Sequence, residues 1–342
     1  MDDIIAAARQ RQAAVTSGKF EWKVKQWMRK GFSILGDVSG RLIPPDDVEF
    51  SAERVFVISG DKVRYESFGP EWNSTKEAYT PFRFLTIWDG TRSIRFQDPE
   101  GFWSGRIENS RFIVGLSALD PLVWTYRMFD REWARIDLSE FVVRPTIDDI
   151  DGEACVVVER SRPSRATLDE PLVERMWLSC NQQYVIRRYE FGRGTWVGDR
   201  LDIEYDDAPQ GIPVPIRWTK AEGLHGDPAP GAIGVSEISN FELNVAIDAK
   251  AFQFEFPVNT WVTEVGDDDP YIVREDGSHR SITQSELDRG ATYDDILATP
   301  SGQAKLTPIT RSARVWLFWT VQAVLGVGIL AYLCRTRLTR NS

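Results

Sequence analysis

The sequence predicts a mainly β protein of the α+β class, with one short N-terminal helix and one C-terminal transmembrane helix. Three observations predict this fold. Apolar and polar residues alternate with a period of two in many short segments after residue 20. Turn residues separate these segments at short intervals, and helical patterns do not alternate with them as in βαβ units, which is typical of an antiparallel sheet. A long apolar stretch without charge lies near the C-terminus.

The chain begins with a pattern that predicts an amphipathic helix over residues 3–16. Ile4, Ala8 and Val15 fall roughly on one helical face. Gly18 is expected to end the helix. A second, less regular helical pattern lies within 111–144, where Leu residues recur at helical spacing around Pro121.

The strands follow from residue 20, where Phe20, Trp22 and Val24 alternate with charged residues. Asp89-Gly90 joins two alternating segments and is a strong hairpin signal. The predicted strands are 20–27, 53–59, 61–67, 83–88, 91–97, 153–160, 173–180, 184–191, 199–206, 213–219, 235–247 and 252–256. Beyond them, Thr283 and Glu286 have the spacing of a helix capping box.

The apolar stretch from Val315 to Cys334 contains no charged residue. At 1.5 Å rise per residue, about 20 residues cross a hydrocarbon core of about 30 Å. Trp316 and Trp319 lie near one end and Tyr332 near the other, as aromatic belts do. The sequence therefore predicts a single-pass membrane protein.

The orientation in the membrane has two alternatives, because basic residues flank the stretch almost equally on both sides. The N-terminal sequence MDDIIAAARQRQ lacks the basic start and apolar region of a signal peptide. Taken literally, it predicts a tail-anchored protein with a cytoplasmic domain. With a signal upstream of this start, the domain would be extracytoplasmic.

Composition and motifs argue against several functions. The net charge is −10 and the basic residues are scattered, which is unlike a nucleic-acid-binding protein. Three cysteines without a CxxC pair, together with two histidines, do not fit the usual zinc sites. The chain has no GxSxG, phosphate-loop, HExxH or EF-hand motif. We therefore expect no enzymatic activity and assign no catalytic, cofactor-binding or metal-binding residue. Acidic clusters such as Asp148-Asp149 are expected in loops, where Asp favours turns.

Cys155 and Cys180 lie on two predicted strands that can form a hairpin. If Arg160 is opposite Arg175, then Cys155 is opposite Cys180, with Cβ atoms about 4.5–5.5 Å apart. A disulfide bond between them is one alternative, and it would favour an oxidising compartment. Two small buried thiols are the other alternative.

Several sequence stretches occur in an order that resembles a known superfamily. They are FEWKVKQW, GDKVRYES, LTIWDGTRSIRF, IDGEACVVVE, ERMWLSCNQQYVIRRYEF, DIEYDDAPQGIPVPIRW and FELNVAIDAKAFQFEFP. Residues 1–262 resemble the LolA-, LolB- and RseB-like lipoprotein carriers and envelope-stress regulators, particularly divergent members from planctomycete-type bacteria. The resemblance implies a strongly curved antiparallel sheet, or incomplete β-barrel, with a helical lid. It also implies a location outside the cytoplasmic membrane and an apolar concave face that holds acyl chains.

The resulting domain prediction has five parts. They are a curved-sheet domain at 1–262, an appended segment at 263–298, a linker at 299–314, the transmembrane helix at 315–334 and a basic tail at 335–342. The leading functional hypothesis is a membrane-anchored envelope protein that binds a lipid, a lipoprotein or another apolar ligand. The alternative is a non-enzymatic regulatory or sensor module that binds a membrane protein partner, as RseB-like proteins do. A hydrolase that uses loop aspartates is the third hypothesis.

Overall fold

The computed structural model describes residues 1–32, 44–73, 76–99, 102–110, 120–129, 136–163, 170–207, 211–223, 230–266 and 269–298. The chain divides into two compact units, Met1–Asp267 and Asp268–Ser342. The predicted linker, transmembrane helix and basic tail lie outside the described residues. Within the described ranges, no helix has the length and apolar character needed to cross a membrane.

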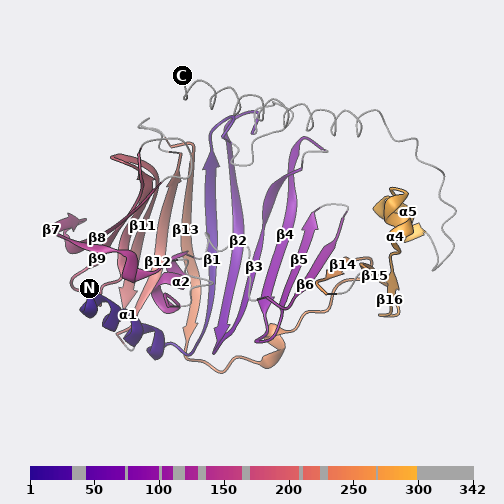
Figure 1. The fold of residues 1–342 in the computed structure, drawn as a ribbon, viewed down its shortest axis with the longest axis horizontal. Coiled ribbons are helices and arrows are strands. Elements are labelled where there is room, and N and C mark those ends of the chain that lie inside the picture. The colour runs from indigo at the N-terminus through magenta and orange to yellow at the C-terminus, as the bar shows by residue number, and fades with distance from the viewer. Residues whose placement is uncertain are drawn as a thin grey trace, which may run out of the picture. The chain divides into compact units, whose positions relative to one another are not determined.

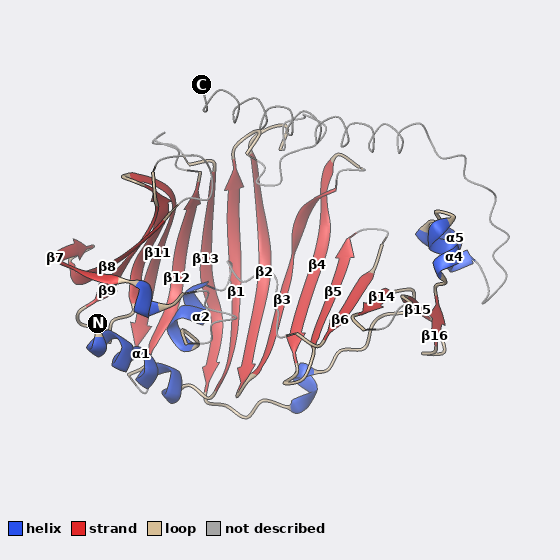
Figure 2. Ribbon diagram, in the orientation of Figure 1, coloured by secondary structure: helices blue, strands red, loops and turns tan. Residues whose placement is uncertain are grey.

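The first unit is mainly β, as predicted (Figures 1 and 2). Its helical segments are α1 (Asp2–Ala14), α2 (Asp120–Tyr126), η2 (Leu138–Glu140) and η3 (Ala249–Phe252). Its strands are β1 (Ser17–Met28), β2 (Val48–Ser59), β3 (Lys62–Asn73), β4 (Ala78–Trp88), β5 (Ser93–Pro99), β6 (Ser104–Glu108), β7 (Val142–Ile150), β8 (Glu153–Arg162), β9 (Leu172–Ser179), β10 (Ile186–Arg193), β11 (Trp196–Asp207), β12 (Pro213–Glu222), β13 (Ala232–Leu243) and β14 (Trp261–Glu264).

These strands form one large curved sheet that does not close into a barrel (Figure 1). Their order is β14-β6-β5-β4-β3-β2-β1-β13-β12-β11-β10-β9-β8-β7. Sequential neighbours pair antiparallel, as expected, whereas β14 pairs with β6 in parallel. The principal crossover joins β1 to β13, with Trp22 opposite Ile238. The first strand of the chain therefore lies in the middle of the sheet.

The two faces of the sheet are covered by different segments. We call the face that carries Phe20, Trp22 and Phe56 the inner face; α1 and α2 pack on it and share its apolar cluster. On the outer face, Leu85 and Ile87 pack with the segment around Phe252. Successive strand residues point to opposite faces, so one strand supplies apolar side chains to both covered faces. Complete burial of one such side chain stabilises the fold by about 1.5–3 kcal/mol.

The differences from the predicted elements have local causes. The predicted strand 252–256 is wrong, because η3 ends at Phe252 and the residues that follow are not in a strand. Phe254 and Phe256 instead place their rings 5.2 and 6.5 Å from Phe96. The strands β6, β7 and β14 were not predicted, since they are short or lack a buried alternation.

The second unit contains the short strands β15 (Tyr271–Val273) and β16 (His279–Ser281) and the helices α4 (Gln284–Asp288) and α5 (Tyr293–Ala298). The capping box of α4 is confirmed. The backbone N–H of Thr283 donates to Glu286 Oε2 at 2.9 Å, and the backbone N–H of Glu286 donates to Thr283 Oγ1 at 3.3 Å. Glu286 also pairs with Arg280, and both side chains are buried.

Candidate functional site

Protein side chains fill the inner face beneath α1 and α2. The rings of Phe20 and Tyr126 stack with centroids 5.5 Å apart. The hydroxyl of Tyr126 donates a hydrogen bond of 3.0 Å to the carbonyl oxygen of Pro213, which fixes α2 to the sheet. Arg127 Nη1 donates at 3.0 Å to the carbonyl oxygen of Val15, which fixes the end of α1 to α2. This part of the inner face is packed core.

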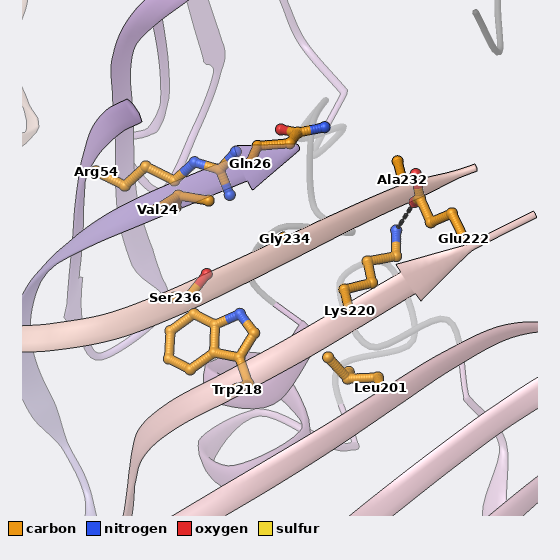
Figure 3. A pocket seen from close by; sticks show the side chains of 10 residues that line it. All are labelled: Val24, Gln26, Arg54, Leu201, Trp218, Lys220, Glu222, Ala232, Gly234 and Ser236. Carbon is orange, nitrogen blue, oxygen red and sulfur yellow. Dashed lines mark ion pairs between the residues drawn. The ribbon is translucent and has the colours of Figure 1, made fainter. Parts of the chain in front are cut away.

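A pocket of about 170 Å³ opens on the inner face, and the described residues that line it all lie on strands (Figure 3). The strand registers explain its position. Val24 is opposite Ser236, and Ser236 is opposite Trp218. Two residues further along β1, Gln26 is opposite Gly234 of β13. Residues two apart on a strand share a face, so these rows bring their side chains to one place. The lining residues are Val24, Gln26, Arg54, Leu201, Trp218, Lys220, Glu222, Ala232, Gly234 and Ser236.

The apolar part of the pocket borders an aromatic row. Trp218 lines the pocket and contacts Trp22, with ring centroids 5.7 Å apart and planes tilted by 55°. Trp22 in turn lies 6.3 Å from Tyr65. All three aromatic side chains are buried. They connect the pocket to the packed core and give it a rigid apolar wall.

Two basic residues, Lys220 and Arg54, lie in the polar part of the pocket, and they differ in whether they have a partner. Lys220 forms an ion pair with Glu222 on the same strand. Arg54 is only partly exposed, and its Nε is buried. Within the described part of the chain, this Nε has no hydrogen-bond partner. Figure 3 shows the Arg54 side chain extending from β2 toward Val24 and Gln26.

Beyond β2 the inner face carries polar as well as apolar side chains, and Tyr65 and Phe84 there still belong to the apolar cluster. Across the sheet from Arg54 lies Ser67, and on the next row Thr86 is opposite Arg95. Arg95 forms an ion pair of 2.9 Å with Glu108. In the described part of the sheet, the apolar concave face implied by the resemblance is therefore present beneath the helices and along the aromatic row, and polar side chains interrupt it toward β5 and β6.

The cysteines lie at the other end of the sheet, away from the pocket's strands. Arg160 is opposite Glu174, one residue from the predicted partner, and Cys155 is opposite Ser179. The predicted register is thus wrong by one residue; it would have placed two arginines opposite each other, which is unfavourable. Cys155 is buried and Cys180 is exposed. Burial raises the pKa of Cys155 to about 12. A disulfide between them stays a prediction.

The acidic clusters serve local structure. Asp148 and Asp149 lie in β7, not in a loop as predicted. The indole Nε1 of Trp177 donates to Asp148 Oδ2 at 2.9 Å, and the backbone N–H of Gly152 donates to Asp149 Oδ1 at 2.8 Å. In the ranges that the structure describes, no group of three or more His, Cys, Asp or Glu side chains is arranged to hold a metal ion.

Sequence reasoning missed the pocket and Arg54. The alternation in β1 and β2 shows which residues share a face, but the meeting of β1 with β13 has no local signal. Glu53 is next to Arg54 in the sequence, and an adjacent acidic residue suggests an ion pair between the two side chains. In the structure, Glu53 points to the outer face and lies 3.8 Å from Lys23.

Comparison with known proteins assigns no family. No family model matches the chain, and no curated protein matches its sequence. The fold is similar to a DUF1329 family protein from Desulfovibrio piger, with a TM-score of 0.42 and 11% identity over 74% of this chain and 96% of that one. It is more distantly similar to PNGF-II, with a TM-score of 0.22 and 10% identity over 72% of this chain and 31% of that one. Both similarities are too distant to carry a functional assignment.

Proposed function

We propose that this chain is a non-enzymatic, membrane-anchored binding protein of the cell envelope. Its curved sheet holds part of a lipid, of a lipidated protein or of another amphipathic ligand in the inner-face pocket. The observation that carries the proposal is the pocket itself, where Val24, Leu201 and Trp218 form an apolar wall that neither α1 nor α2 lines. Concave sites with an apolar lining and a few polar groups are typical ligand sites.

The size of the pocket limits what it can enclose. Its volume of about 170 Å³ is below the roughly 300–1,000 Å³ of pockets that bury a drug-sized ligand. Beneath α1 and α2 the inner face is packed core. A ligand would therefore insert one group and leave the rest along the open inner face. This supports recognition of part of an amphiphile over complete enclosure of an acyl chain.

The membrane and envelope parts of the proposal rest on the sequence. The uncharged stretch 315–334 supports an anchor. The resemblance of residues 1–262 to lipoprotein carriers supports a position outside the cytoplasmic membrane. An anchored domain would work at a fixed place, so a role in local binding fits better than transport as a free shuttle.

The test is to identify what the protein carries. The full chain is purified in an uncharged maltoside detergent, and bound molecules are extracted and measured by mass spectrometry. A Gly234→Leu variant is the matched control, because Gly234 lines the pocket and the added leucine side chain would occupy it. We expect one class of amphiphile enriched over the bulk membrane lipids in the wild type and reduced in the variant. Identical lipid profiles at bulk ratios in both proteins would contradict the proposal.

A second candidate function, a regulatory module that binds a membrane protein, is favoured by the strand β7. Val142 and Ile147 on this strand are 71% and 60% exposed, which is unusual for large apolar side chains at a sheet end. A photo-crosslinking residue at Ile147 tests this candidate in intact membranes. A regulator should give one defined crosslinked protein, and a matched crosslinker at exposed Lys23 should not. Diffuse or absent crosslinking at both positions would remove this candidate.

A further inference from the structure

We infer that the inner-face pocket binds an oxyanion, a carboxylate or phosphate group attached to a short apolar stem, and that Arg54 binds the anion. The inference rests on the proposed function, since it names the chemistry of the ligand for the same pocket. Neither the resemblance nor the comparisons assign such a residue. The case depends on the state of Arg54, on the groups around it and on the space beside it.

Arg54 differs from the other arginines of the central strands. Arg64 and Arg83 share Glu66 at 2.9 and 2.6 Å, and Arg95 pairs with Glu108. Arg54 forms no ion pair within the described ranges, although the chain contains 51 acidic residues. A partly buried guanidinium charge without a partner is unfavourable. An anionic ligand would remove that penalty.

Among the described residues, the strand registers explain why no acidic side chain pairs with Arg54. Its direct neighbours across the strands are Trp22 on β1 and Ser67 on β3. Glu53, beside it in sequence, points to the opposite face. The acidic residue of the pocket, Glu222, is held by Lys220. The charges of the lining residues therefore sum to a single positive charge, and that charge belongs to Arg54.

The remaining lining groups fit an amphipathic anion. A guanidinium presents a planar set of N–H donors that matches a carboxylate or phosphate with two parallel hydrogen bonds. Gln26 and Ser236 supply further hydrogen-bonding groups, and Trp218 supplies an apolar surface. At Gly234 an added Cβ would meet nothing within 4 Å, so the backbone there borders open space. Among the described residues that line it, the pocket thus combines the unpaired Arg54 cation with an apolar wall.

The volume sets the size of the group that enters. About 170 Å³ corresponds to the liquid volume of roughly six water molecules. A phosphate or carboxylate with a few methylene groups occupies a space of this order. A complete acyl chain does not fit, so its distal part would remain outside. The same chemistry is available from a lipid headgroup and from a free single-chain amphiphile.

The experiment measures binding to the purified full chain in uncharged maltoside detergent by calorimetric titration. The probes are octyl phosphate, octanoate, octanol, inorganic phosphate and dihexanoyl phosphatidylglycerol. Octanol lacks the anion, and inorganic phosphate lacks the stem. Comparison of octyl phosphate with the phosphatidylglycerol distinguishes a free amphiphile from a lipid headgroup as the source.

Four variants connect the binding to the pocket. Arg54→Gln removes the cation and Arg54→Lys keeps a charge without the planar donor set. Gly234→Val fills the pocket without changing charge, and its Cβ has room, so the fold is preserved. Lys23→Gln is the matched control, because it removes one positive charge from the outer face of the neighbouring strand.

We expect the wild type to bind an anionic amphiphile at least about tenfold more tightly than octanol, because a charge-assisted hydrogen bond contributes this much or more. Arg54→Gln should abolish this difference, Arg54→Lys should retain part of it, Gly234→Val should weaken binding of every amphiphile, and Lys23→Gln should change nothing. Equal binding of octanol and octyl phosphate, unaltered by Arg54→Gln, would overturn the inference and leave the proposed function standing. Failure of every amphiphile to bind, with no lipid recovered from the purified chain, would overturn both.

Discussion

Arg160 on β8 and Glu174 on β9 form an ion pair of 2.6 Å in which each side chain is only 5% exposed. The pair lies within a larger cluster on the inner face. The hydroxyl of Tyr189 donates to the same Glu174 oxygen at 3.2 Å, and the Arg160 guanidinium lies 4.7 Å from the ring centroid of Phe141. Glu174 therefore joins three strands through one carboxylate.

Removing this carboxylate should be strongly destabilising. In Glu174→Ala, Arg160 would lose its buried partner, and an uncompensated buried charge of this kind costs about 3–5 kcal/mol. Arg160 also pairs with Glu140, so the lower end of this range is expected. Urea unfolding of the two proteins measures the loss. The matched control is Glu204→Ala, whose partner Arg217 is largely exposed and whose removal should cost less than about 1 kcal/mol. Similar losses in both variants would contradict the prediction.

A glycine on β6 should tolerate no larger side chain. An added Cβ at Gly105 would overlap the ring of Phe256, which packs beside Phe96. Gly105→Ala should therefore displace the covering segment on the outer face and cost about 1–3 kcal/mol, as overpacking does. Gly234→Ala is the control, because it meets open space. Thermal unfolding compares the two variants with the wild type. An unchanged Tm for Gly105→Ala would show that the covering segment moves aside without loss of stability.

Acid should weaken the outer face through Glu66. Burial opposes its ionisation, but hydrogen bonds from Arg64 and Arg83 hold the pKa of Glu66 below its usual value of 4.5. Because the pKa in the folded state is the lower one, this contribution to stability is complete above about pH 4.5 and is lost as the pH falls through the folded-state pKa. The free energy of unfolding of wild type and Glu66→Gln, measured against pH, should therefore converge in acid. A constant difference at every pH would count against this assignment.

The two described cysteines should differ in reactivity. Burial raises the pKa of Cys155 to about 12, so its thiol stays protonated at neutral pH, whereas Cys180 is exposed. In a Cys334→Ser background, Ellman's reagent at pH 8 should label one thiol in the folded protein and a second one after unfolding. No labelling before reduction would instead reveal the Cys155–Cys180 disulfide, which is the first alternative drawn from the sequence.

The sequence predicts the local structure well where burial and turn chemistry coincide. The Asp89-Gly90 hairpin is confirmed: Gly90 has a φ of 101°, and Asp89 Oδ1 accepts a hydrogen bond of 2.8 Å from the backbone N–H of Thr91. β7 could not be predicted, because its side chains are mostly exposed and its pairing shifts between Val143 and Ile147. A strand with mostly exposed side chains does not show the alternation of apolar and polar residues on which strand prediction depends.

The candidate site was beyond prediction for a different reason. Its residues come from five strands, and the pairing of β1 with β13 joins residues separated by more than 200 positions. Alternation shows that Val24 and Gln26 share a face, but only the register shows that Ser236 and Gly234 face them. The neighbours of Arg54 depend on two registers, those of β2 with β1 and with β3, and a shift of one residue in either would have changed them.

The central position of β1 has a consequence for how the chain acquires its fold. The strand emerges first from the ribosome, yet its second partner, β13, is synthesised only after residue 231. Until then one edge of β1 stays unpaired, so the half of the sheet from β1 to β6 must wait for a distant segment. Such non-local pairing slows folding, and an exposed edge invites association with other chains. Translation arrest or truncation before residue 243 should therefore release an aggregation-prone intermediate that depends on chaperones.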